Sequence, residues 1–419
     1  MSIRDAGARL VNNHFHALTH TNFRYFWFGQ CVSLIGTWMQ NIGQSWLVLT
    51  LTGSPFLLGL VGTIQFLPVT FLSLFAGVLI DKYPKKQILL VTQSVSMVLA
   101  LILSALVFTH TVKYGYVMTL AFLLGLTNTF DMPTRQAFNI EIVGKEDLMN
   151  AIALNSTTFN LARIVGPAIG ATMMAFFGPA WCFLLNGLSF IAVIYGLLQI
   201  KTDPYVRQKK KDIGILREIK DGIVYIANHK ILAQTLLLVT VVGTLAYNFN
   251  VLIPVMTKSV LHLDEKTYGL LMSCLGVGSL AGALTMSLRS KKGPRYSLIL
   301  VCCTLISVFL ALTGIAHSVY GVGAFLALTG LCNILFSTNS NSTLQIHAKD
   351  EYRARVMSVY SLVFAGSTPL GNFFSGMVAE RYGADGAFIA CGILLLAGFL
   401  TVVMIFRKKP SVREEQAVF

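Results

Sequence analysis

The chain has 419 residues, of which 55% are hydrophobic and only 12% are charged, and its mean hydropathy is +0.68. A soluble globular domain carries about 25% charged residues, so this composition excludes an ordinary soluble enzyme. The net charge of +14 would suit a nucleic-acid-binding protein, but the placement of the charges argues against nucleic acid as a partner.

About a dozen long apolar segments predict membrane-spanning helices. They lie at residues 24–51, 56–80, 87–109, 114–134, 148–177, 180–200, 231–257, 267–288, 296–316, 319–340, 355–379 and 386–406. Most have about 20 residues or more, enough for a helix to cross a hydrocarbon core of about 30 Å. They do not alternate in polarity as barrel strands would. The sequence therefore predicts an all-α membrane protein with about twelve transmembrane helices.

Lys and Arg residues concentrate in every second gap between these segments. The gaps on the other side contain only Lys113, Lys258, Lys266 and Arg381. Because cytoplasmic loops are enriched in Lys and Arg, both termini are expected in the cytoplasm, with the chain in a plasma or bacterial inner membrane. The basic loops are expected to contact anionic membrane lipids.

The first segment carries a polar face. Gln30, Ser33, Thr37, Asn41 and Gln44 follow helical spacing and so share one side of the predicted helix. Polar groups that face lipid without a partner are costly, so this side is expected to face water or another helix.

The gap between the second and third segments carries a charged motif made of Gly77, Asp81, Lys82, Lys85 and Lys86. This motif resembles the signature loop of the major facilitator superfamily, with lysines in place of arginines. The resemblance implies two pseudo-symmetric six-helix bundles that move a small molecule by alternating access. It also implies that Gly77 permits close helix approach and that Asp81 latches the cytoplasmic gate against the helix at 355–379. The alternative is a charged loop that only sets topology.

The fourth segment ends near an acid, Asp131, with Asn128 before it and Arg135 after it. None of the 18 acids is expected in the middle of a segment. The family resemblance implies proton coupling, and Asp131 is the candidate proton carrier, with Arg135 or Arg163 as neighbours. The alternative is an ordinary acid at a helix end.

The fifth segment contains Arg163, the one Lys or Arg deep inside an apolar segment. An intramembrane charge is a functional hypothesis by default, so Arg163 could attract an anionic substrate or organise a proton site. It could instead be a structural arginine bonded to backbone carbonyls. Gly166, Pro167 and Gly170 resemble the antiporter motif of drug exporters, which implies a helix distortion that lets the outer half of the helix flex.

The longest polar stretch, at 201–230, separates predicted bundles at 1–200 and 231–419. Similar sequences at 36–37 and 243–244 support duplicated halves, the build of many secondary transporters.

The polar stretch itself predicts a helix. Leu216, Ile219, Ile223 and Ile226 recur at helical spacing, which indicates an amphipathic helix along the cytoplasmic surface. A tether that lets the halves rock is favoured over a regulatory site.

The second half repeats the polar faces, with Thr244, Tyr247 and Asn248 on the seventh segment and Asn333 and Ser337 on the tenth. The superfamily lines a central cavity with helices 1, 4, 7 and 10. The resemblance therefore implies that these residues bind substrate together with the polar residues of the first and fourth segments. The alternative is that they hold helices together.

A narrower resemblance, to the drug-and-siderophore exporter branch, rests on residues 23–24, 29–30, 33–40, 51–55, 65–68, 133–138 and 150–156. It implies a secondary exporter of amphipathic small molecules, coupled to protons and acting as a monomer. Alternatives are a lipid or siderophore carrier with other coupling, and a transporter-like sensor that binds ligand without flux.

Motifs for catalysis or cofactors are not found in the sequence. It has no phosphate-binding G-x-x-x-x-G-K-[ST] loop and no assembled nucleophile triad. The seven Cys lie inside apolar segments without metal-binding spacing, and the eight His lie in loops or at segment ends. We therefore expect no enzyme activity, no cofactor and no metal.

Overall fold

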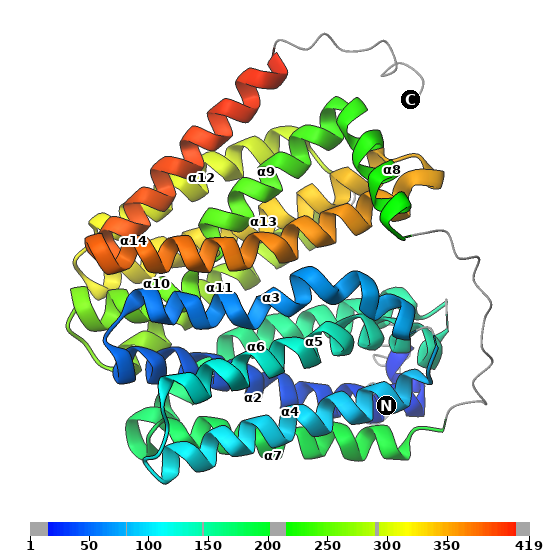
Figure 1. Cartoon of the computed structure of the whole chain (residues 1–419). Helices are drawn as coiled ribbons and strands as arrows, with labels where there is room; N and C mark the ends of the chain where they lie inside the picture. Colours follow the sequence, from blue (N-terminus) through cyan, green and yellow to red (C-terminus); the bar gives the residue numbers. More distant parts are fainter. Residues whose placement is uncertain (1–15, 81, 145, 202–214, 290–292, 408–419) are drawn as a thin grey trace, which may run out of the picture. The chain divides into compact units, whose positions relative to one another are not determined.

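The structure is a computed structural model that describes residues 16–80, 82–144, 146–201, 215–289 and 293–407. Across these residues the elements are helices and none is a β-strand, which confirms the predicted all-α class. The chain forms two compact units (Figure 1): unit 1 is Met1–Lys210 with Leu263–Gly276, and unit 2 is Lys211–His262 with Val277–Phe419. Unit 1 thus includes a short stretch that the sequence analysis placed in the second half.

Unit 1 is built from one short 3₁₀-helix and a series of long helices. These are η1 (His16–Thr19), α2 (Thr21–Thr52), α3 (Pro55–Ile80), α4 (Lys85–Phe108), α5 (Tyr114–Val143), α6 (Leu148–Phe177), α7 (Pro179–Gln199) and the first part of α11 (Glu265–Arg289).

Glycine followed by proline marks two of the helix boundaries in unit 1. Gly53 ends α2 with a φ of 65°, and its N–H donates to the carbonyl of Leu49. Pro55 then begins α3, where its missing N–H costs no hydrogen bond. Gly178, with a φ of 86°, and Pro179 do the same between α6 and α7. These boundaries follow the predicted ones closely because the turn residues are readable in the sequence.

Helices α2 and α7 pack closely along a glycine seam. Gly29, Gly36 and Gly43 recur every seven residues on α2, and a Cβ atom built on each would lie 2.7 to 3.0 Å from atoms of α7. Small residues at such positions let helix backbones approach one another. The seam therefore fixes α2 against α7 inside unit 1.

Unit 2 contains the remaining elements. These are α8 (Ile215–Asn228), α9 (Lys230–Ala246), α10 (Phe249–Val255), a π-helix, η2 (Met256–Val260), the rest of α11, α12 (Tyr296–Ile315), α13 (Val319–His347) and α14 (Asp350–Arg407). The long α14 contains a break at Gly383, where φ is 77°, so it combines the last two predicted segments.

Two predicted segments differ from the structure. Helix α5 continues through Pro133 to Val143, although the prediction ended the segment at 134. The predicted segment at 231–257 is interrupted between α9 and α10. There the side-chain Nδ2 of Asn248 donates to the carbonyl of Thr244 at 2.8 Å, which takes the acceptor that a continuing helix would use.

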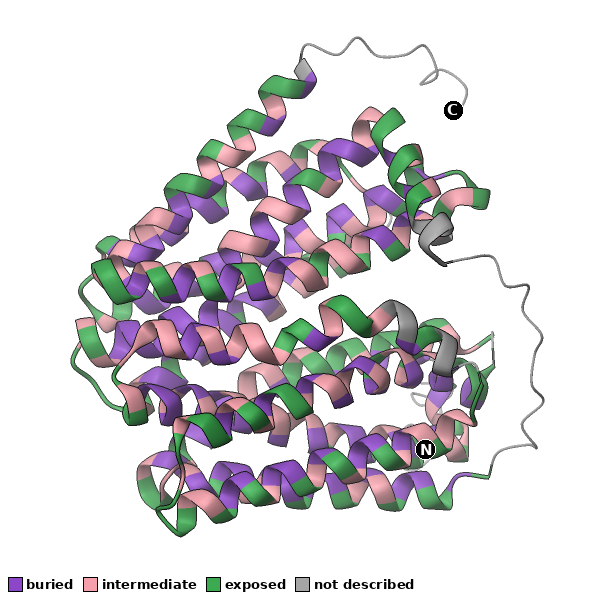
Figure 2. Ribbon diagram, in the orientation of Figure 1, coloured by how far each residue is buried: buried purple, intermediate pink, exposed green. Residues whose placement is uncertain are grey.

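Exposed apolar side chains cover the long helices, as expected for helices in lipid. Among the described residues, nine helical segments are long and apolar enough to cross a membrane, with α14 counted once. The more polar α2 and α5 are not among them. Figure 2 shows exposed and buried residues sharing the same helices, and the exposed ones include Val91, Phe71 and Ile191. The chain is therefore a multi-pass membrane protein.

Candidate functional site

Asp131 lies buried inside unit 1, with 4% of its surface exposed. Its Oδ1 accepts hydrogen bonds from Thr92 Oγ1 and Gln93 Nε2 of α4, each at 2.7 Å. Its Oδ2 accepts from the guanidinium of Arg135, one turn further along α5. Arg135 is therefore confirmed as the charged neighbour that the sequence suggested.

The position of Asp131 corrects the sequence analysis. Since α5 runs to Val143, Asp131 is well inside the helix rather than at its end. The prediction that no acid lies within a spanning helix was wrong for this residue, because Pro133 was taken as the helix end. The sequence gave no sign of Thr92 and Gln93 as partners, since which face of α4 meets α5 depends on tertiary packing.

Arg163 sits on α6 beside aromatic rings of unit 1. Its guanidinium carbon is 5.9 Å from the centroid of the Trp38 ring, a cation–π distance. Trp38 in turn meets the Phe159 ring edge-to-face, with centroids 5.7 Å apart. No contact between Arg163 and Asp131 is found among the described residues. Arg163 thus belongs to an aromatic cluster on α2 and α6, separate from the Asp131 cluster.

The glycines of the motif at 166–170 are packing positions in this structure. A Cβ atom on Gly166 would lie 2.5 Å from Cβ of Trp38, and one on Gly170 would lie 2.9 Å from Cδ1 of Ile42. Helix α6 continues without interruption through Pro167. The motif therefore holds α6 close against α2, and the predicted flexing at this point stays a prediction.

The polar face of α2 is partly buried. Gln30 and Ser33 are each 4% exposed, and the side-chain nitrogen of Gln30 is buried with no hydrogen-bond partner among the described residues. Gln44 Nε2 donates to Gln65 Oε1 of α3 at 3.1 Å. Thr37 and Asn41 are half-buried. The face is thus polar with one buried donor left unpaired within unit 1.

A second polar pair joins α2 to α7 on another side of α2. Gln40 Oε1 accepts from Asn186 Nδ2 at 2.6 Å, and both residues are buried. The sequence analysis missed this pair because Gln40 lies outside the stripe that it followed.

In unit 2 the predicted polar residues gather where α9 ends. Asn333 Nδ2 donates to the carbonyl of Ala246 at 3.4 Å, and Asn248 caps the break as described above. Asn333 and Asn248 are 0% and 2% exposed, and the Oδ1 atom of each has no partner among the described residues. Tyr247 packs edge-to-face on Phe364 of α14. These amides stabilise the break and leave two buried acceptors.

Two other predicted cavity residues have ordinary contacts. Ser337 Oγ donates to the carbonyl of Ile334 in its own helix at 3.3 Å. Asn128 is half-buried on α5.

The charged motif between α3 and α4 is tied into unit 1 at its basic end. Lys85 Nζ lies 3.2 Å from Glu141 Oε2 of α5. Lys86 Nζ donates to the carbonyl of Ile200 at 2.7 Å, at the end of α7, where a cation suits the helix dipole. Lys82 is exposed, and Asp81 lies outside the described residues. The latch predicted for Asp81 therefore stays a prediction.

Gly77 differs from its predicted role in one respect. A Cβ atom built on Gly77 would meet no described atom within 4 Å. The close helix approach predicted at Gly77 is therefore not present in this structure.

A cluster that the sequence analysis missed joins η1 to the start of α6. Asp147 Oδ1 lies 2.8 Å from His16 Nδ1, and Asp147 Oδ2 lies 2.6 Å from His20 Nε2. Asn150 Oδ1 accepts from the backbone N–H of Ala17 at 3.0 Å. The histidines are four residues apart, which was the available signal.

The His16–His20–Asp147 group also brings donor atoms within 4.8 Å of one another, near enough for a metal ion. In this structure, however, both carboxylate oxygens are within hydrogen-bond distance of the imidazoles. Hydrogen bonds from His20 and His16 lower the pKa of Asp147 below its ordinary value of 3.8. We assign the group to holding η1 on α6.

The predicted amphipathic helix exists as α8, and it is docked rather than loose. Asp221 lies 3.6 Å from Arg355 of α14, and the Tyr225 ring stacks on the Tyr352 ring with centroids 4.2 Å apart. The Tyr225 hydroxyl also accepts from the backbone N–H of Lys349 at 3.1 Å. Helix α8 is therefore part of unit 2.

The fold and the polar interiors of its helices define a membrane transporter of the major facilitator type. Solved structures share this fold across nearly the whole chain. A bacterial homologue of the human lysosomal transporter Spinster, in an inward-facing and unoccupied conformation, aligns with a TM-score of 0.74 at 10% identity, covering 92% of this chain and 96% of that one. A nucleoside transporter aligns with a TM-score of 0.72 at 12% identity, covering 93% and 100%.

Residues 12–418 match the transmembrane secretion effector family, and the chain belongs to that family. Among its relatives, a staphyloferrin A transporter of Staphylococcus aureus is 26% identical over 94% of this chain and 98% of its own length. A macrolide efflux protein A of Streptococcus pyogenes is 23% identical over 91% and 95%. A multidrug efflux pump of Mycolicibacterium fortuitum is 26% identical over 90% and 93%. The resemblance to the exporter branch is thereby confirmed.

Proposed function

We propose that this chain is a secondary active exporter of amphipathic small molecules, driven by proton antiport through alternating access. Relatives named for macrolide, multidrug and siderophore transport support the substrate class. The observation that carries the coupling is the buried carboxylate of Asp131, held within α5 by Arg135 and two residues of α4.

Proton exchange at Asp131 would change its contacts. An ionised carboxylate only accepts hydrogen bonds, whereas a protonated one must donate through one oxygen. Protonation therefore removes at least one of the present contacts, and the charge pair with Arg135 is lost with the charge. In this proposal the release of Arg135 links the proton to the movement of α5 against α4.

Reconstituted vesicles test the coupling. Asp131→Asn should reduce pH-gradient-driven transport at least about tenfold, the effect of losing one contact worth about 1.4 kcal/mol or more in the driven step. Counterflow of labelled substrate without a gradient should persist. Glu141→Gln, which changes an exposed acid on the same helix, is the control and should keep both activities. If Asp131→Asn keeps gradient-driven transport, Asp131 is not the carrier.

The substrate path in this proposal follows the polar faces of the first, fourth, seventh and tenth spanning segments. Gln30, Asn248 and Asn333 support it, since each leaves a buried amide atom unpaired among the described residues. The cytoplasmic gate at the 77–86 loop, the division into bundles at 1–200 and 231–419, and the cytoplasmic termini belong to the same proposal.

A siderophore carrier is the second candidate, favoured by the staphyloferrin A relative and by the cationic Arg163 beside Trp38. Counterflow assays with a labelled macrolide and a labelled siderophore separate the two readings. Arg163→Gln should reduce siderophore counterflow and leave macrolide counterflow unchanged if the substrate is anionic. Ligand binding without counterflow would instead indicate a sensor.

A further inference from the structure

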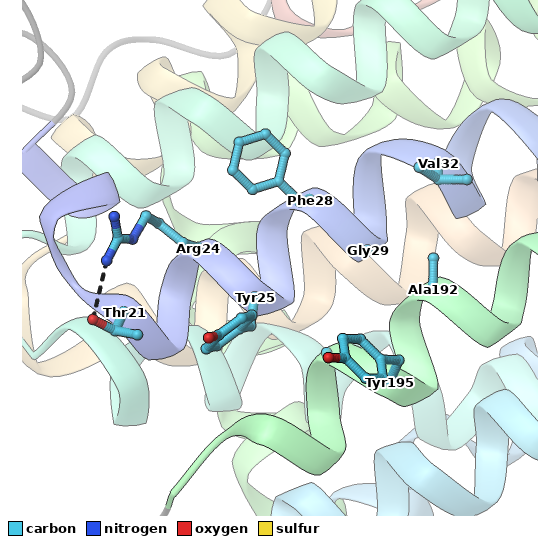
Figure 3. A pocket seen from close by; sticks show the side chains of 9 residues that line it. Thr21, Arg24, Tyr25, Phe28, Gly29, Val32, Ala192 and Tyr195 are labelled. Atoms are coloured by element: carbon cyan, nitrogen blue, oxygen red, sulfur yellow. Dashed lines mark hydrogen bonds between the residues drawn. The ribbon is translucent and has the colours of Figure 1, made fainter.

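A groove runs between α2 and α7 at the end of unit 1 where α2 begins (Figure 3). It encloses about 560 Å³. Its floor is the contact between the two backbones: a Cβ atom on Gly29 would lie 2.8 Å from the carbonyl oxygen of Ala192, and one on Gly196 would lie 2.4 Å from that of Tyr25. Because both floor residues lack side chains, the space above the contact stays open.

The walls of the groove are apolar or aromatic and face outward. Phe28, Val32 and Tyr195 are 58%, 50% and 60% exposed. From Thr21 to Val32 the groove follows α2 for about 16 Å, at about 1.5 Å per residue. That is about half of a 30 Å hydrocarbon core, the depth of one leaflet. An outward apolar groove of this length suits a lipid acyl chain.

The outer end of the groove is positively charged. Arg24, in the first turn of α2, is exposed, and its guanidinium donates to Thr21 Oγ1 at 3.2 Å (Figure 3). No side chain caps the start of α2 and no acid lies in its first turn. Free N–H groups and the helix dipole favour an anion at a helix start. The acid nearest to this end by contact, Asp147, already has both oxygens on His16 and His20.

Tyrosines stand at the level expected for the membrane surface. Tyr25 and Tyr195 lie four residues from the start of α2 and from the end of α7, respectively, and both line the groove. Tyr is enriched at membrane–water interfaces. The aromatic level, the leaflet-length groove and the cationic end therefore occur in the order of a phospholipid's own parts.

We propose that this groove binds one anionic glycerophospholipid, with an acyl chain between Phe28, Val32 and Tyr195 and the phosphate on Arg24. A guanidinium can bind phosphate through two parallel hydrogen bonds. The proposal rests on the orientation in the proposed function, which places the start of α2 at the cytoplasmic, anionic leaflet. A bound transport substrate or a partner helix would give different outcomes below.

Native mass spectrometry of the purified full-length protein tests the site. The probes are phosphatidylglycerol and phosphatidylcholine of the same chain length, added in competition in detergent. The wild type should retain phosphatidylglycerol preferentially. Arg24→Gln should retain about tenfold less of it, the size expected for one charge-assisted contact. Ala192→Phe, which fills the groove, should lose both lipids.

Matched controls are Lys349→Gln, an exposed cation in unit 2, and Ile191→Phe, an exposed position on α7 next to the groove but not lining it. Both should behave as the wild type. Equal retention of phosphatidylglycerol by Arg24→Gln, Ala192→Phe and the controls overturns the proposal, as does equal retention of the two lipids by the wild type.

Arg24→Lys guards against a folding defect, because it keeps the charge and loses the planar fork. It should retain phosphatidylglycerol at a level between the wild type and Arg24→Gln. Displacement of the lipid by a transported macrolide would instead identify the groove as a substrate site. No pH gradient exists in this assay, so a failure of proton coupling at Asp131 leaves its outcome unchanged.

Discussion

At the scale of single residues, two carboxylates in unit 1 do different work. Asp131 is buried and held by a hydroxyl, an amide and a guanidinium. Asp147 stands at the start of α6 without capping that helix, because both of its oxygens face imidazoles. The first carboxylate is placed to exchange a proton, and the second to hold a segment in position.

The Thr92 contact predicts a measurable loss of stability. Thr92→Val keeps the shape of the side chain and removes one hydrogen bond to the ionised Asp131. A hydrogen bond to a charged group contributes about 1.5–3 kcal/mol, so the thermal unfolding temperature in detergent should fall. Thr119→Val, an exposed threonine bonded only to its own helix, should leave it unchanged. An equal fall in both variants would contradict the role of Thr92.

The Asp147 cluster predicts a pH dependence at the acid side. Because hydrogen bonds from His20 and His16 lower the pKa of the folded state below 3.8, ionised Asp147 stabilises the attachment of η1 above that value. The contribution is lost as pH falls through the lowered pKa. Hydrogen exchange at residues 16–20 should therefore accelerate below pH 3.8.

Two variants separate Asp147 from general acid unfolding. Asp147→Asn should free residues 16–20 at every pH. Asp264→Asn removes another carboxylate of lowered pKa, one bonded to the backbone of Thr267, and should leave residues 16–20 protected. Unchanged protection in Asp147→Asn would show that the histidines do not depend on Asp147.

At the scale of elements, apolar run length predicted most helices within a few residues. Glycine–proline pairs such as Gly53 and Pro55 are local signals, so the ends of α2 and α6 were readable. The continuation of α5 past Pro133 was not, since tertiary contacts decide whether a helix tolerates proline. The break after α9 depends on where Asn248 finds an acceptor, which no spacing rule shows.

The break after α9 predicts a strong effect at a glycine of α14. A Cβ atom on Gly371 would lie 2.2 Å from the carbonyl oxygen of Thr244 and 2.4 Å from Oδ1 of Asn248. Gly371→Ala should therefore destabilise the protein by about 1–3 kcal/mol, the usual cost of overpacking, as read from thermal unfolding. Gly115→Ala, where no described atom lies within 4 Å, should be neutral. Equal stability of the two variants would contradict this packing.

At the scale of the whole molecule, the alternating charge of the loops predicts the orientation. A membrane-impermeant maleimide should label Thr111→Cys and His317→Cys in intact cells. It should label Gln87→Cys and Lys349→Cys only after the cells are made permeable. The native cysteines are all free, so each reading is compared with the unmodified chain. The reverse pattern would place the termini outside and remove the basis for the cytoplasmic gate.

Docking of α8 on α14 limits how far the connection between the units can stretch. Tyr225 and Asp221 bind the later part of the polar stretch to unit 2, so only the chain from Lys201 to Ile215 is left to span the interval. At about 3.3–3.6 Å per residue, a fully extended peptide of that length reaches about 50 Å. That leash sets an upper bound on cytoplasmic separation in any transport cycle, and cutting it should relax the bound without touching either polar interior.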